Sequence, residues 1–229
     1  MELNKVVCGD CLQEMDKLIE ENIKVDAIIT DPPYEFKKGG FGGGQAELSK
    51  RALKSDIVGG KLDVGFNVEN VFNKFRKLQD KCNVCIFCAE EQMIDICNYA
   101  RKKNYYYTVL VWHKTNPTPL CNNRYLNSIE FIVHIREKGV KILGDYHSKG
   151  KIYTSPINKK DKTLFNHPTV KPLELIEKLL KNHTEENDIV FDPFAGSGTT
   201  GIAARNLNRN FILIEKEQKY IDIIKDRLL

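Results

Sequence analysis

Short apolar runs alternate with amphipathic stretches along this chain, and the alternation predicts an α/β fold. Six stretches have apolar residues at helical spacing: Cys11–Glu21, Val68–Leu78, Glu90–Lys102, Pro172–Asn182, Gly198–Leu207 and Gln218–Leu228. Seven short runs are mostly apolar, which indicates strands: Lys5–Cys8, Val25–Thr30, Asn83–Cys88, Tyr107–Trp112, Ile129–Ile135, Asp188–Asp192 and Phe211–Ile214. We therefore expect a mainly parallel sheet with helices on both faces.

Two irregular segments interrupt this pattern. Glycines crowd the stretch at about 35–65, which has few regularly spaced apolar residues and is predicted to be a flexible loop. The second segment, about 114–165, is predicted to be a small insertion around one strand. At 229 residues the chain is long enough for one substantial domain but too short for two with linkers, so residues 1–229 are expected to form a single domain.

The net charge of +4 permits nucleic acid binding without requiring it. The positions of the basic residues are more informative, because several lie in the glycine-rich segment, including Lys37, Lys38, Lys50, Arg51 and Lys54. Taken alone, such residues are as well explained by a solvated face as by phosphate contacts.

Asp31-Pro32-Pro33-Tyr34 follows directly on the predicted strand Val25–Thr30. Ligands of open α/β sheets bind at the carboxyl ends of strands. A carboxylate there can accept a hydrogen bond from an amino group, Tyr34 can stack on a planar base, and the prolines hold the backbone extended. The tetrapeptide fits an exocyclic amine of a nucleobase, although a plain strand ending in a proline turn has the same pattern.

A second motif runs from the predicted strand ending at Asp192 through a glycine-containing turn into a helix. Its turn residues include Phe194, Gly196, Ser197, Gly198 and Thr199. In Rossmann-like sheets this arrangement offers the free N–H groups of a helix amino terminus to an anionic part of a cofactor. The spacing differs from G-x-G-x-x-G and lacks the Walker lysine, which argues against a nucleoside triphosphate.

Together these motifs resemble those of the β-class S-adenosylmethionine-dependent amino-methyltransferases of DNA, in which D-P-P-Y precedes the F-x-G-x-G cofactor loop. Further segments agree in order: Trp112-His113-Lys114 with Asn116-Pro117-Thr118-Pro119, and His167-Pro168-Thr169-Val170-Lys171-Pro172. The resemblance covers nearly the whole chain. It implies a seven-stranded Rossmann-like sheet, circularly permuted so that the strands before Asp31 and Gly196 lie side by side.

The resemblance also implies residue roles. Catalysis is expected from Asp31, Pro32, Pro33 and Tyr34. S-adenosylmethionine is expected to contact Asp10, Asp31, His167, Thr169, Lys171, Asp192, Phe194, Gly196, Ser197, Gly198, Thr199 and Glu215. Double-stranded DNA is expected to contact Lys37, Lys38, Lys50, Arg51, Lys54, Lys114, Asn122, Asn123 and Arg124.

The expected reaction is direct transfer of a methyl group to adenine N6 of a flipped-out base. Asp31 favours adenine, because the cytosine-N4 enzymes of this family usually carry serine at that position. The alternatives are a cytosine-N4 methyltransferase and a DNA-binding regulator that keeps the fold but has lost turnover. RNA or protein glutamine as the substrate fits the motif order less well. A homodimer and a cognate restriction enzyme are both compatible with the resemblance.

The cysteines and histidines predict no metal site. Cys82, Cys85 and Cys88 lie on a predicted strand, where residues three apart point to opposite faces, so we expect buried structural thiols. The histidines show no metal-binding spacing. The amino-terminal residues do not resemble a signal peptide and no apolar run is long enough to span a membrane, so a cytoplasmic protein with reduced thiols is expected.

Overall fold

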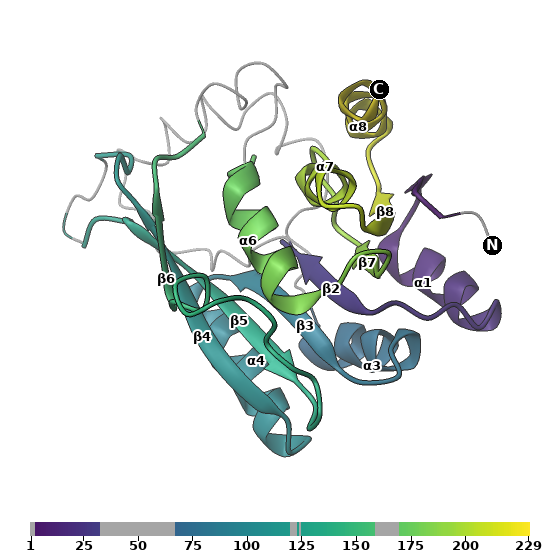
Figure 1. Ribbon diagram of the computed structural model, residues 1–229, viewed down its shortest axis with the longest axis horizontal. Coiled ribbons are helices and arrows are strands. Elements are labelled where there is room, and N and C mark those ends of the chain that lie inside the picture. Colours follow the sequence, from purple (N-terminus) through teal and green to yellow (C-terminus); the bar gives the residue numbers. More distant parts are fainter. Residues whose placement is uncertain (1–2, 33–66, 120–122, 124, 159–169) are drawn as a thin grey trace.

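Eight strands form one sheet in the order β1-β8-β7-β2-β3-β5-β4-β6 (Figure 1). The computed structural model describes residues 3–32, 67–119, 123, 125–158 and 170–229. The strands are β1 (Lys5–Cys8), β2 (Ala27–Thr30), β3 (Asn83–Cys88), β4 (Tyr106–Lys114), β5 (Ile129–Arg136), β6 (Ile152–Ser155), β7 (Ile189–Asp192) and β8 (Asn210–Glu215). Within these residues only β5 runs antiparallel to its neighbours β3 and β4. The expected α/β, mainly parallel sheet is confirmed.

The expected strand number of seven is wrong, because β6 lies in the segment read as irregular. β6 has four residues, pairs in parallel with β4 alone, and exposes Ile152. Because this edge strand is short and half of its residues are exposed, its sequence shows almost no hydrophobic pattern. Its position is fixed by tertiary contacts, such as the hydrogen bond that Trp112 Nε1 donates to Ser155 Oγ over 2.9 Å.

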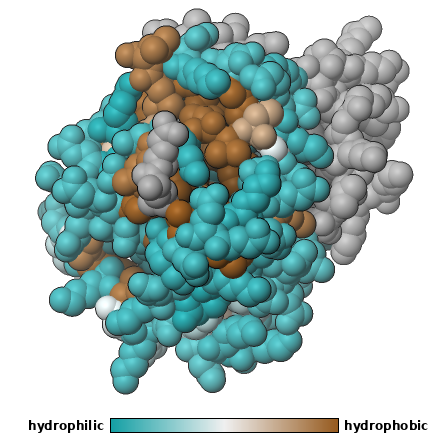
Figure 2. All heavy atoms as spheres, turned by 90° about the vertical axis from the view of Figure 1, so that its right-hand side faces the viewer, coloured by the Kyte–Doolittle hydropathy of each residue, from teal (hydrophilic) through white to brown (hydrophobic). Residues whose placement is uncertain are grey.

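At the other edge of the sheet, β1 pairs with β8 alone. Val6 and Val7 of β1 are partly buried and pack against the apolar clusters on opposite faces of the sheet. Figure 2 views the molecule from the side that carries β1, α1 and α8, and it shows apolar side chains gathered in a central area within a hydrophilic surround. No further strand of the described chain pairs with this edge, and apolar side chains reach the surface on this side of the molecule.

In the described part of the chain, six helices cover the sheet in two layers (Figure 1). They are α1 (Cys11–Glu20), α3 (Val68–Leu78), α4 (Glu90–Lys102), α6 (Leu173–His183), α7 (Thr199–Asn206) and α8 (Gln218–Leu228). Their ends differ from the predicted ones by no more than one residue. One layer contains α1, α3 and α4, and the other contains α6, α7 and α8.

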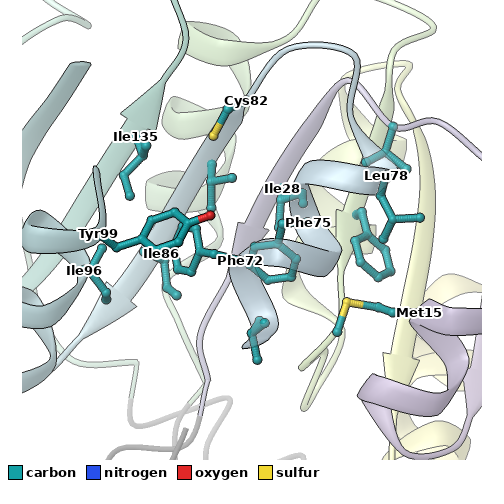
Figure 3. Close-up of a cluster of buried hydrophobic side chains, with 14 of the residues drawn as sticks. Met15, Ile28, Phe72, Phe75, Leu78, Cys82, Ile86, Ile96, Tyr99 and Ile135 are labelled. Atoms are coloured by element: carbon teal, nitrogen blue, oxygen red, sulfur yellow. The ribbon is translucent and has the colours of Figure 1, made fainter. Parts of the chain in front are cut away.

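Each layer encloses an apolar core. Met15 from α1, Phe72 and Phe75 from α3, and Ile96 from α4 belong with Ile28 of β2 to the apolar cluster on one face (Figure 3). The other core forms beneath α6, α7 and α8. Cys82 and Cys88 belong to the first core and Cys85 to the second, which confirms that these thiols alternate across the sheet. Among the described residues, no helix has the length and apolarity needed to cross a membrane.

Candidate active site

Four acidic residues lie at the carboxyl ends of four adjacent parallel strands. Asp10 follows β1, Glu215 ends β8, Asp192 ends β7 and Asp31 follows β2. The pairing of β2 with β7 in register, Ile28 opposite Phe191, brings the two sequence motifs to neighbouring strands as expected. In open α/β sheets, this edge is where ligands bind.

Asp31 belongs to a partly buried network of ion pairs. Lys171 Nζ lies 2.6 Å from Asp31 Oδ2 and 2.6 Å from Glu130 Oε1. Glu130 Oε2 in turn lies 3.1 Å from Lys114 Nζ. The side chain of Asp31 is 21% exposed, whereas those of Lys171, Glu130 and Lys114 are 9–12% exposed. Asp31 is thus the member of the network with most access to a ligand.

Opposite charges balance inside this network. Burial alone would lower the pKa of Lys171, but the charges of Asp31 and Glu130 outweigh burial and raise the pKa above its ordinary value. Lys171 therefore stays cationic. Lys171 stands in a recognisable sequence motif, whereas Glu130 stands in β5 without any local signal. Lys114 has its ammonium group within this network, and its predicted DNA contact stays a prediction.

Asp192 holds the turn between β7 and α7. Its Oδ1 accepts hydrogen bonds from Thr30 Oγ1 at 2.7 Å and from the backbone N–H of Phe194 at 3.1 Å, and its Oδ2 accepts one from Thr200 Oγ1 at 2.7 Å. Burial raises the pKa of this carboxyl to about 6 although all three donors act to lower it. Its side chain thus ties β2 to the turn, and its predicted cofactor contact stays a prediction.

The turn itself places two glycines in the left-handed region, with φ of +53° at Gly196 and +78° at Gly198. Helix α7 begins directly afterwards without a side-chain cap, which leaves the first N–H groups of the helix available to a ligand. Arg227 of α8 donates from Nη1 to the carbonyl oxygen of Ser197 over 2.6 Å. This arginine stands outside the sequence motifs, so its contact with the turn could not be predicted from them.

Glu215 and Asp10 complete the edge. Glu215 accepts hydrogen bonds from the N–H groups of Gly196 at 2.8 Å and Glu217 at 2.9 Å, and burial raises its pKa. Asp10 Oδ1 caps α1, accepting from the N–H groups of Leu12 at 3.0 Å and Gln13 at 3.3 Å. Both carboxylates therefore have structural bonds, and their predicted cofactor contacts stay predictions.

Many predicted site residues fall outside the described part of the chain. They are Pro33, Tyr34, Lys37, Lys38, Lys50, Arg51, Lys54, Asn122, Arg124, His167 and Thr169, together with the predicted loop at about 35–65. Asn123 is described and exposed, in a turn between β4 and β5.

Comparison with known proteins gives the class of this fold and site. Residues 25–226 match the model of a DNA methylase family, N6_N4_Mtase. The chain is 31% identical to the type II methyltransferase M2.LlaDCHI of Lactococcus lactis subsp. cremoris, over 97% of this chain and 88% of the relative. It is 30% identical to M1.HpyAVI in a crystal structure with S-adenosylmethionine, with a TM-score of 0.71 and coverage of 97% of this chain and 98% of the other.

The chain therefore belongs to the N6-adenine/N4-cytosine DNA methylase family. It is a site-specific DNA methyltransferase that uses S-adenosylmethionine. The fold is also that of the cytosine-N4-specific PvuII DNA methyltransferase, with a TM-score of 0.71 at 16% identity over 98% of this chain and 86% of the other. The fold is thus shared by enzymes that act on different bases.

The donor groups of the carboxyl edge fit this cofactor. Free N–H groups at the start of α7 suit a carboxylate, and the carboxylate of Glu215 suits ribose hydroxyls. The left-handed glycines let the backbone of the turn come close to a ligand.

Proposed function

We propose that this protein methylates adenine N6 in double-stranded DNA. The observation that carries the proposal is the carboxylate of Asp31 at the carboxyl end of β2, held by Lys171 at 2.6 Å next to the glycine turn that follows β7. In the family of DNA amino-methyltransferases that the sequence motifs resemble, the cytosine-N4 enzymes usually have serine in place of this aspartate. The family and its cofactor support methyl transfer, and Asp31 supports the choice of adenine.

The amine of adenine is a weak nucleophile because its lone pair is delocalised into the ring. In the proposed mechanism, the Asp31 carboxylate and the Pro32 carbonyl oxygen accept the two amine hydrogens and direct the lone pair toward the methyl donor. S-adenosylmethionine supplies an electrophilic methyl group on a sulfonium. After transfer, the extra proton on nitrogen passes to Asp31 or to solvent. The target base is flipped out of the duplex, and Tyr34 is proposed to stack on it.

The other roles are proposals of the same kind. Gly196, Ser197, Gly198, Thr199 and Phe194 would surround the methionine part of the cofactor, and Glu215 its ribose. The basic residues of the segment at about 35–65 would contact DNA phosphates. A cytoplasmic location, a homodimer and a cognate restriction enzyme belong to the same proposal, as does the β-class assignment.

Product analysis tests the choice of base. Unmethylated plasmid DNA is incubated with the protein and S-adenosylmethionine, digested to nucleosides and analysed by mass spectrometry. We expect N6-methyldeoxyadenosine. N4-methyldeoxycytidine alone would overturn the choice of adenine. If no methylated nucleoside is found, the result would favour the alternative function of a DNA-binding regulator without turnover. Methylation-sensitive sequencing of the same DNA then gives the recognised site.

We further expect Glu130→Gln to lower kcat by roughly 10-fold to 100-fold, which corresponds to the loss of a charge-assisted hydrogen bond of about 1.5–3 kcal/mol. Glu130 acts as a positioning residue, because it is the second carboxylate that pairs with Lys171, the partner of Asp31. The KM for S-adenosylmethionine should change little, and Glu130→Asp should recover part of the rate.

The matched control for this variant is Glu69→Gln. Glu69 pairs with Lys102 over 3.2 Å, but both side chains are well exposed, so the rate should stay at the wild-type value. An unchanged kcat in Glu130→Gln, or an equal loss in Glu69→Gln, would show that Glu130 does not position the site.

A further inference from the structure

One cysteine and two histidines meet inside the molecule, away from the carboxyl edge. Cys85 of β3 pairs in register with His134 of β5, and His183 at the end of α6 packs over them. One possible ligand atom from each residue lies within 4.8 Å of the other two. Exposed fractions are 1%, 2% and 6% respectively. Since α6 rises about 1.5 Å per residue, its length separates His183 from the Lys171 end of the helix by about 15 Å.

Asn83 determines which nitrogen of His134 carries hydrogen. The Nδ2 of Asn83 donates to the carbonyl oxygens of Asp26 at 3.1 Å and His183 at 2.9 Å, so its Oδ1 is the atom that faces His134 Nε2 at 3.3 Å. An amide oxygen only accepts, so Nε2 must donate. The Nδ1 of His134 then has a bare lone pair. Metal-binding histidines are oriented in this way, by an oxygen that accepts from the other ring nitrogen.

His183 gives an independent indication of a ligand site. Its Nδ1 is buried without a hydrogen-bond partner, a condition that among the described residues is shared only by Asn182 Oδ1. Buried polar atoms without partners are costly and call for an explanation.

A pocket of about 150 Å³ adjoins the two histidines of this group. His134, His183 and Asn182 line it, together with apolar side chains of β4, β5 and α6. The two imidazole rings are stacked, with centroids 3.9 Å apart and an angle of 38° between the planes. Their nitrogens would have to turn toward a common point to bind an ion. The pocket provides room for that rotation and for a fourth ligand.

We propose that Cys85, His134 and His183 bind a Zn²⁺ ion, with Asn182 Oδ1 or a water molecule from the pocket as the fourth ligand. A thiolate and two imidazoles suit zinc and exclude the oxygen-preferring Mg²⁺ and Ca²⁺. On binding, the thiol of Cys85 loses its proton to solvent and the sulfur bonds the ion. The ion would join β3 and β5 to the end of α6 and would have a structural role apart from methyl transfer.

Metal titration of the whole protein tests the proposal. After dialysis against a chelator, Zn²⁺ is added in competition with a chromogenic chelator, and Co²⁺ is added to a second sample. We expect one Zn²⁺ per chain, a rise in Tm, and the visible and thiolate charge-transfer bands of tetrahedral cobalt. A wild-type protein that binds no stoichiometric Zn²⁺, or whose bound cobalt lacks the thiolate band, would overturn the site without reference to any variant.

Variants then assign the ligands. His183→Gln and Cys85→Ser should each weaken Zn²⁺ binding by at least about 100-fold, more than the 10-fold to 100-fold typical of residues that only orient a ligand. The control is His147→Gln, which changes an exposed histidine outside the group and should bind Zn²⁺ as the wild type does. Wild-type affinity in the folded His183→Gln protein, or an equal loss in the control, would contradict the assignment.

Discussion

Asp31→Ala is expected to lower methyl transfer by at least about 100-fold, the loss seen when a preorganised group at the reacting atoms is removed. The proposed role of Asp31 is to accept a hydrogen from the target amine, and alanine offers no acceptor. Affinity for S-adenosylmethionine should stay within a few fold, because the glycine turn is held by Asp192 and Arg227 instead. Single-turnover kinetics and calorimetry measure the two effects separately.

The control for this variant is Asp16→Ala, which removes another aspartate paired with a lysine. Asp16 bonds Lys74 on the outer surface of α1, away from the carboxyl edge, so activity should not change. Asp31→Asn adds a second comparison, because the amide keeps the shape and loses the charge. Activity of Asp31→Ala above a tenth of the wild-type rate would contradict the proposed role.

Gly198→Val is expected to abolish detectable binding of S-adenosylmethionine and to lower Tm. The φ of +78° is strained for valine, and a Cβ at this position would lie 2.8 Å from Ile224 Cγ1. The turn or α8 must therefore move, which displaces the N–H groups at the start of α7. Calorimetry of cofactor binding and a thermal melt give the two readouts.

The control variant Gly139→Val separates an effect on the cofactor site from an effect of backbone strain alone. Gly139 also has a positive φ, of +96°, but the nearest atom to its added Cβ is the flexible Lys81 Nζ at 3.0 Å, far along the chain from the turn. This variant should lose stability and keep its cofactor affinity. Unchanged affinity in a folded Gly198→Val protein would show that the turn does not bind the cofactor.

The sequence predicted those elements whose apolar residues are repeated locally. β3 is a clear example, since all six of its residues are buried between the two layers. β6 was missed because only the last of its four residues is buried, and its place depends on a pairing with β4. Local pattern therefore predicts central strands better than edge strands.

In the candidate site, too, the residues within local sequence motifs could be predicted and those placed by tertiary contacts could not. Asp31 and Lys171 stand in motifs, so a resemblance could assign them. Glu130 and Arg227 reach the site from β5 and α8, in segments without such a motif, and only the folded chain shows what they contact. The grouping of Cys85, His134 and His183 likewise has no characteristic spacing, because each residue comes from a different element.

The pairing of β2 with β7 has a consequence for synthesis of the chain. The hydrogen bond from Thr30 to Asp192 spans 162 residues, so the strand that carries Asp31 leaves the ribosome long before its neighbour on one side exists. Contacts between such distant residues form slowly in folding. Throughout that interval one edge of β2, whose four residues are all buried in the folded protein, lacks its pairing partner, a condition that favours aggregation. We therefore expect the nascent chain of this protein to depend on chaperones until β7 has been synthesised.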